Sequence, residues 1–296
     1  MRVERLPPNR VYRFYRGGAL LGRFRGEPEE DGPFPEDWVG SVTAASNPGR
    51  DEPDAGLSRL EDGRLLRDVV GPDTGVLVKL LDSAERLPVH YHPDRDFARV
   101  RLDSPYGKTE AWIVLDTREA EADVWVGLRE PIPREQYRDW IDRHDLDALL
   151  GSLNHLTVRA GDVVYVPGGV PHAIGAGLLV AELQEPTDFS IVCEWEGYPI
   201  RAEDADLGLG WDTALDALDL GRHEPIRRLP EEAREFFWAD EVADAAGRFA
   251  VWIVLDGQGS IDGRATRRGD CFAVPAAAER VDVEGDLRVL RCLGPA

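Results

Sequence analysis

The sequence predicts a mainly β protein made of two related β units in tandem, with a helical insertion in the first unit. Three observations support this fold class. Short apolar runs rich in valine, isoleucine and aromatic residues are broken by glycine, proline and aspartate, which favours short strands. Two sequence elements recur in the same order along the chain. Between the two elements of the first copy, one stretch has helical spacing.

Four apolar runs are the clearest predicted strands, and they lie at Val76–Leu81, Trp112–Leu115, Val163–Val166 and Leu178–Ala181. Each is four to six residues long and is rich in residues that favour β structure. The segment Gly26–Gly63 is instead rich in proline, glycine and acidic residues, so we expect it to form a loop.

The helical insertion is predicted at residues 129–152. Pro131 and Pro133 open this stretch, and large apolar side chains follow at helical spacing, namely Tyr137, Trp140, Ile141, Leu146, Leu149 and Leu150. This pattern predicts one or two helices between strands. Further helices are predicted at Asp212–Leu220 and Pro230–Asp240.

The internal repeat is the strongest architectural observation. Trp112–Asp116 recurs as Trp252–Asp256, 140 positions later. A Gly-Asp-x-x-x-Val-Pro element follows each copy, at Gly161–Pro167 and at Gly269–Pro275, 108 positions apart. The first copy therefore has 32 more residues between its two elements, and the helical insertion accounts for this surplus.

The composition excludes several classes of partner. The formal net charge of -21 gives a strongly negative field, which repels nucleic acid and anionic membrane surfaces. No apolar run approaches the roughly 18 residues that a membrane helix needs, and the N-terminal residues lack the apolar run of a signal peptide. We therefore expect a cytoplasmic protein with a small-molecule partner. The sequence leaves the oligomeric state open.

A candidate metal site appears on two motif elements. Gly161, Pro167, Gly169 and His172 fit the second motif of the cupins, in which a strand and a Pro-Gly turn aim a histidine into a β-barrel. Upstream, the segment His90–His92 has two histidines at alternate positions, and alternate residues of a strand share one face.

A carboxylate would complete this ligand set. Glu110, just before the Trp112 strand, is the best placed. Three imidazoles and one carboxylate suit a divalent metal. We expect Zn²⁺ first, with Mn²⁺, Fe²⁺ and Ni²⁺ as alternatives.

The second unit has no such ligand set. Arg280 falls where the counterpart of His172 would be, and no His-x-His segment precedes it. We therefore expect tandem cupin (jelly-roll) barrels, with a metal-binding domain over residues 1–235 and a metal-free domain over residues 236–296.

Several segments together resemble the class I mannose-6-phosphate isomerase family, metal-dependent cupins that interconvert an aldose 6-phosphate and a ketose 6-phosphate. The matching segments are Arg16–Gly18, Glu36–Ser41, Leu77–Asp82, Leu87–Asp94, Gly107–Trp112 and Val166–Gly175. The resemblance covers most of the chain. Lys79 and Lys108 are the only lysines and both fall within these segments, and the resemblance implies that they line the active-site cavity.

Two positions depart from the family pattern. His90 stands where the family usually has glutamine. Val192 aligns with a family arginine, and a guanidinium is the strongest side-chain partner for a phosphate or a developing enediolate. Arg201 lies nine residues further on and is a candidate substitute that binds substrate.

The primary functional prediction is a metal-dependent aldose–ketose isomerase. Such a reaction needs an electrophile on the sugar oxygens and an acid–base group. Lys108 could polarise an oxygen or move the proton, and Lys79 could contact the sugar or a phosphate. Acidic residues after the last ligand are candidate bases, and an aromatic residue among them is a candidate sugar-binding group. These residues are Glu185, Asp188, Glu194 and Trp195.

The substrate and two other functions stay open. The resemblance implies mannose 6-phosphate, whereas Val192 favours an unphosphorylated sugar. A non-catalytic, metal-binding, sugar-sensing cupin would bind sugar without forming product. An iron-dependent oxygenase would consume oxygen.

Overall fold

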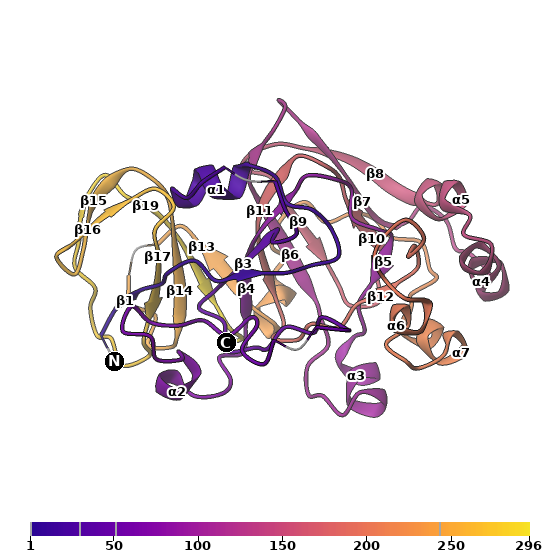
Figure 1. Ribbon diagram of the computed structural model, residues 1–296, viewed down its shortest axis with the longest axis horizontal. Helices are drawn as coiled ribbons and strands as arrows, with labels where there is room; N and C mark the ends of the chain where they lie inside the picture. The colour runs from indigo at the N-terminus through magenta and orange to yellow at the C-terminus, as the bar shows by residue number, and fades with distance from the viewer. Residues whose placement is uncertain (1, 30, 51, 243) are drawn as a thin grey trace.

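The computed structural model describes residues 2–29, 31–50, 52–242 and 244–296, which form four antiparallel sheets with short helices around them (Figure 1). Sheet I has the order β2 (Arg10–Val11), β3 (Glu36–Val39), β4 (Leu77–Ser83), β11 (Leu178–Gln184), β6 (Glu110–Thr117) and β9 (Val163–Val166). Sheet II has the order β12 (Ile191–Val192), β5 (His90–Tyr91), β10 (His172–Ile174), β7 (Ala122–Leu128) and β8 (Leu153–Val158).

Two further sheets form the C-terminal barrel. Sheet III has the order β1 (Glu4–Arg5), β17 (Cys271–Val274), β14 (Ala250–Asp256), β19 (Arg288–Leu293) and β13 (Trp238–Asp240). Sheet IV has the order β16 (Arg264–Arg267), β15 (Gln258–Ile261) and β18 (Val283–Gly285). β1 comes from the start of the chain, so the N-terminus completes a sheet of the C-terminal barrel.

The helices are short. They are α1 (Leu20–Arg25), α2 (Arg67–Val70), α3 (Arg95–Arg101), α4 (Arg134–Asp142), α5 (Leu146–Gly151), α6 (Ala202–Ala205) and α7 (Trp211–Ala214), with 3-10 turns at Leu215–Ala217 and Glu231–Glu235. The pair α4 and α5 is the predicted helical insertion, and it lies at the end of the molecule opposite sheet IV (Figure 1). Among the described residues, no helix combines the length and apolar character that crossing a membrane requires.

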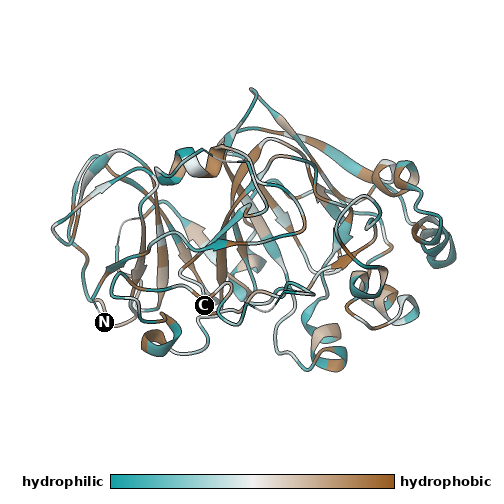
Figure 2. Cartoon of the chain, in the orientation of Figure 1, coloured by the Kyte–Doolittle hydropathy of each residue, from teal (hydrophilic) through white to brown (hydrophobic). Residues whose placement is uncertain are grey.

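The sheets stack in layers with apolar side chains between them. One core joins sheet I to sheet III through residues such as Leu80 and Ile253, and a second fills the space between sheets I and II around Trp112. A third lies between sheet II and the helices, and a fourth fills the C-terminal barrel around Trp252. Brown segments run along the central strands, whereas the outer helices carry both teal and brown segments (Figure 2). The mainly β fold class is confirmed.

The sequence repeat corresponds to equivalent strand pairs. Trp112 of β6 is in register with Val164 of β9, and Trp252 of β14 is in register with Phe272 of β17. The turn before the second strand is also the same in both copies. The Asp162 carboxylate accepts a hydrogen bond from Arg159 N at 3.0 Å, and Asp270 accepts one from Arg267 N at 2.9 Å.

Two secondary-structure predictions were wrong. β3 lies within the stretch predicted as loop, because its charged residues masked a strand in which all four residues are buried. The buried Asp37 carboxylate of β3 is balanced by Arg25, whose Nε lies 2.8 Å from it. β13 lies at the end of the stretch predicted as a helix from Pro230, because Trp238 and Ala239 pair with the edge of sheet III instead.

Candidate active site

Three histidines meet inside the first barrel. His90 and His172 are paired in register on adjacent strands of sheet II, and His92 follows two residues after His90. Their ring centroids lie 4.2 to 4.9 Å apart, and one ligand atom from each lies within 4.8 Å of the others. They form the one group of this kind found in the part of the chain that the structure describes, and such a group could hold a metal ion.

Backbone carbonyls orient all three rings in the same way. The Nδ1 atoms of His90, His92 and His172 each lie 2.8 Å from a carbonyl oxygen, belonging to Pro88, Phe189 and Val170 respectively. A carbonyl oxygen only accepts hydrogen bonds, so each Nδ1 carries the proton and each Nε2 keeps a lone pair. A backbone acceptor on the second ring nitrogen is the usual support of a metal-binding histidine.

The Nε2 atoms face inward without protons between them. Nε2 of His172 lies 3.0 Å from Nε2 of His90, and neither nitrogen can donate in this tautomer. Two lone pairs at this distance repel each other, and a cation between them removes the repulsion. The donor set therefore fits a divalent metal.

Glu110 supplies the carboxylate from the opposite sheet. Its Oε2 lies 3.1 Å from Nε2 of His92, and its Oε1 lies 3.4 Å from Nε2 of His172. Oε1 also accepts a hydrogen bond from Trp112 Nε1 at 2.9 Å, which holds the carboxylate toward the histidines. The structure thus brings together all four residues that the sequence suggested as metal ligands.

Protonation states in this cluster also suit a metal. Burial lowers the pKa of all three imidazoles, and for His92 burial and the neighbouring Lys108 lower the pKa to about 3. Burial also opposes the charged form of Glu110, but Lys108 and His92 outweigh it and hold the pKa of that carboxyl well below its usual value. Neutral imidazoles and an ionised carboxylate are the forms that bind metal.

Lys108 lies directly against this cluster. Its Nζ is 2.7 Å from Nε2 of His92 and 2.9 Å from Oε2 of Glu110. Lys79 is further away and hydrogen bonds to Glu182 at 3.2 Å, and the same Glu182 oxygen lies 4.0 Å from Lys108. Glu182 was not singled out from the sequence. The sequence pattern could have identified it, because Glu182 is the one acidic residue in the otherwise apolar run Leu178–Leu183.

The charged network continues to the N-terminal segment. Glu36 lies 3.7 Å from Lys79 and 3.4 Å from Nε of Arg13. Arg13 in turn donates two hydrogen bonds to Asp188, at 2.8 and 3.1 Å. Charges of alternating sign therefore run from Asp188 through the barrel interior to the histidine cluster.

A cavity of about 350 Å³ lies next to this network. Its lining includes Arg13, Asp188, Ser190 and Val192. Val192 pairs in register with His90, and directly opposed residues of neighbouring strands share one face of the sheet. The cavity wall and the histidine cluster are therefore neighbours, and this volume is within the range of small-molecule sites.

Two predicted acidic residues have other partners. The Glu185 carboxylate accepts a hydrogen bond from Thr109 N at 3.0 Å and pairs with Arg95 at 2.5 Å. Glu194 accepts one from Val89 N at 2.9 Å and pairs with Arg86. Both carboxylates therefore hold the segments that carry ligands, and neither is among the residues that line the cavity.

The two predicted substrate-binding residues lie in different places. Arg201 lines the cavity, with a side chain that is 63% exposed and pairs with Asp204 at 2.6 Å. Trp195 is instead stacked on Trp211, with ring centroids 5.5 Å apart, and is a partly buried residue that packs against the core beside the helices. It is not part of the cavity lining.

The C-terminal barrel has an apolar interior at the equivalent position. Ala250 stands where the first repeat has Glu110, and Trp252 Nε1 has no hydrogen-bond partner among the described residues, unlike Trp112 Nε1. Arg280 is 82% exposed and pairs with Asp282. The repeat has thus kept the strand pairing of the first barrel but not its polar interior.

Sequence comparisons relate part of the chain to known isomerases. No protein-family model matches the chain. A mannose-6-phosphate isomerase of Streptococcus mutans is 29% identical over 242 residues, which is 73% of this chain and 72% of that protein. A mannose-6-phosphate isomerase of Bacillus subtilis is 34% identical over 113 residues. This match spans only 38% of the chain and 34% of that protein.

Solved structures extend the likeness to the whole chain. The crystal structure of mannose 6-phosphate isomerase from Bacillus subtilis superposes with a TM-score of 0.73 at 21% identity, covering 99% of both chains. A variant of phosphomannose isomerase from Salmonella typhimurium gives 0.71 at 14% identity over all of both chains. The chain is similar in sequence and in fold to mannose-6-phosphate isomerases. The chain therefore shares its overall fold with these solved structures.

Proposed function

We propose that this chain is a metal-dependent aldose–ketose isomerase that converts mannose 6-phosphate to fructose 6-phosphate. The observation that carries the proposal is the convergence of three oriented imidazoles and Glu110 beside Lys108 in the barrel interior. The likeness to mannose-6-phosphate isomerases supports the reaction and the substrate class.

His90, His92, His172 and Glu110 would hold the metal, and we propose Zn²⁺ as the first ion to test. When bound, the metal would act as a Lewis acid that polarises the sugar oxygens. Imidazole and carboxylate ligands of this kind would also suit Mn²⁺, Fe²⁺ and Ni²⁺.

The chain's own residues would move the protons. The reaction takes one proton from C2 of the aldose and returns one to C1, and it shifts the hydroxyl proton between O2 and O1, so no atom is gained or lost. Lys108 is the charged donor nearest the cluster, and we assign it the proton on the sugar oxygen. Lys79 and Glu182 would hold Lys108 in place through the shared Glu182 carboxylate.

Asp188 is the one predicted base that also lines the cavity. Its carboxylate lies within the wall shared with Ser190 and Val192, next to the histidine cluster. We therefore retain Asp188 as a residue of the reaction site, where its carboxylate holds Arg13. We assign Glu185 and Glu194 structural roles because they lie outside the cavity lining and hold the segments that carry ligands.

An unphosphorylated sugar is the second candidate substrate. The three arginines that line the cavity each pair with a carboxylate, Arg13 with Asp188, Arg201 with Asp204, and Arg50 with Glu52. Paired guanidinium groups attract a phosphate dianion less than free ones do, and the net charge of -21 adds to this effect.

A coupled assay for fructose 6-phosphate tests the proposal. The protein, loaded in turn with Zn²⁺, Mn²⁺ and Ni²⁺, should convert mannose 6-phosphate at about 10 per second, a common enzyme rate. Conversion of unphosphorylated mannose but not of its phosphate would support the second candidate. Saturable sugar binding without product would indicate a sugar-sensing protein. The absence of both binding and turnover would refute both candidate substrates.

A further inference from the structure

The cavity beside the histidine cluster contains one deeply placed guanidinium. Arg13 lines the cavity with a side chain that is only 7% exposed, whereas the side chains of Arg50 and Arg201 are 38% and 63% exposed. Arg50 and Arg201 therefore lie toward solvent, and Arg13 lies at the inner wall.

Two carboxylates hold Arg13 in one orientation. Its Nη1 and Nη2 donate to the two oxygens of Asp188 at 2.8 and 3.1 Å, and its Nε lies 3.4 Å from Glu36. Asp188 is itself held by Ser46, whose backbone N donates to Oδ2 at 2.8 Å. The guanidinium is thus fixed before any ligand enters, and its positive charge is already balanced.

Arg13 nevertheless keeps unused donors. A guanidinium has five N–H groups, and Asp188 takes one from each Nη atom. The Nε makes no hydrogen bond within the described part of the chain. Among the described residues no other group accepts a hydrogen bond from Nη1 or Nη2, so their second hydrogens remain for a ligand in the cavity.

Position 192 lies in the same cavity wall. Val192 pairs with His90 across the strands, so its side chain stands beside the histidine cluster. The sequence resemblance places an arginine at this position, but a valine cannot donate a hydrogen bond. The cavity therefore has a guanidinium from the N-terminal segment and none from β12.

We propose that Arg13 supplies to the substrate the guanidinium donor that position 192 lacks. Its free N–H groups bond to the sugar oxygens at the reacting end as negative charge develops there. Because Asp188 and Glu36 balance its charge, Arg13 acts as a directed donor and not as an attractor of the phosphate. This inference rests on the proposed isomerase function.

Arg13→Lys tests the inference while keeping a cation between the two carboxylates. A lysine retains the charge but loses the planar fork. We expect kcat to fall about 100-fold, as for loss of a transition-state donor. Because the ground state does not use this donor, KM should stay within about threefold of the wild-type value.

Binding provides a second readout. We would titrate mannitol 1-phosphate, the reduced form of the sugar phosphate, into the metal-loaded proteins by calorimetry. It has no carbonyl and does not react, so Arg13→Lys should bind it within about threefold of wild type. A loss of affinity above about tenfold with kcat unchanged would overturn the proposal and assign Arg13 to the phosphate.

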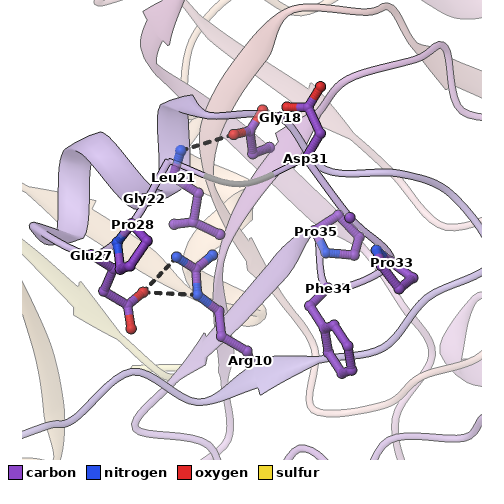
Figure 3. Close-up of a pocket in the computed structure, with 12 residues that line it drawn as sticks. Arg10, Gly18, Leu21, Gly22, Glu27, Pro28, Asp31, Pro33, Phe34 and Pro35 are labelled. Carbon is purple, nitrogen blue, oxygen red and sulfur yellow. Dashed lines mark hydrogen bonds and ion pairs between the residues drawn. The ribbon is translucent and has the colours of Figure 1, made fainter.

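Arg10→Met is a matched control from the same segment. Arg10 pairs with Glu27 at 2.5 and 3.0 Å in a separate cavity whose lining includes Leu21 and Asp82 (Figure 3). That cavity contains none of the four proposed metal ligands. Arg10→Met should therefore keep both kcat and the affinity for mannitol 1-phosphate.

The double variant Arg13→Lys/Val192→Arg tests whether the two positions serve one subsite. We expect it to regain at least about tenfold in kcat over Arg13→Lys, because a donor is restored in the same wall. A folded, metal-loaded double variant that is no faster would overturn the proposal, as would wild-type kcat in Arg13→Lys. An inactive wild type would refute the proposed isomerase function itself, and the inference with it.

Discussion

Variants of Glu185 distinguish a structural role from a catalytic role most clearly. Its carboxylate is fully buried. It accepts a hydrogen bond from Thr109 N at 3.0 Å and forms an ion pair with Arg95 at 2.5 Å. Thr109 lies between Lys108 and Glu110, so Glu185 sets the backbone from which a proposed ligand and a proposed proton donor extend.

The expected cost of Glu185→Ala follows from these two contacts. A buried amide left without its acceptor costs about 1–3 kcal/mol, and the Arg95 pair, 30% exposed on the arginine side, adds about 0.5 kcal/mol. The free energy of unfolding should therefore fall by about 1.5–3.5 kcal/mol. For 296 residues, with an unfolding entropy of about 2.1 cal/mol/K per residue, Tm should fall by about 2–6 °C.

Glu185→Gln is the variant to compare with Glu185→Ala, because it removes the charge but keeps a hydrogen-bond acceptor. Its amide oxygen still accepts from Thr109 N, so the protein should keep most of its stability and kcat should stay within about threefold of wild type. Calorimetric melting, metal content and the coupled assay measure the three quantities. If Glu185→Gln kept its Tm and its metal but lost kcat by more than about 100-fold, the structural assignment would be refuted in favour of an acid–base role.

Four other changes have defined outcomes. Lys108→Met should bind metal but lose at least about 100-fold in kcat, and wild-type kcat in that variant would exclude it as the proton donor. Glu194→Ala should lower the free energy of unfolding by about 3 kcal/mol, because Arg86 loses its partner; an unchanged melting curve would contradict this. Trp252→Phe should lower Tm but leave kcat and metal content unchanged, since it changes only the C-terminal core. Burial opposes the charged form of Glu36, but nearby cations lower its pKa to about 2, so its stabilisation is present above the unfolded pKa of 4.5 and is lost as pH falls toward 2. The difference in unfolding free energy between wild type and Glu36→Gln should therefore be constant above that range and change only within it.

Local patterns in the sequence predicted the elements that depend on local chemistry. The histidines and Glu110 lie on motifs with short internal spacing, and the repeat around Trp112 and Trp252 predicted two equivalent strand pairs. β3 was missed because Glu36 can be buried only where cations pair with it. These cations, Arg13 and Lys79, come from other segments of the chain.

Arg13 shows what local patterns do not contain. It lies among similar arginines in the N-terminal segment, and nothing distinguishes it there from Arg10 or Arg16. Only the folded chain brings it to Asp188, 175 residues away, and into the cavity wall. The roles of Glu185 and Trp195 likewise depended on partners that the sequence does not place.

Metal content measured together with isomerase activity tests the central claim most directly. After loading and dialysis, the wild type should hold one divalent ion per chain, convert mannose 6-phosphate to fructose 6-phosphate, lose this activity on chelation and regain it when metal is restored. His172→Ala should lose both the ion and the activity, because one of the three converging imidazoles is gone. Full activity in the chelated protein, or one bound ion per chain in His172→Ala, would contradict the account.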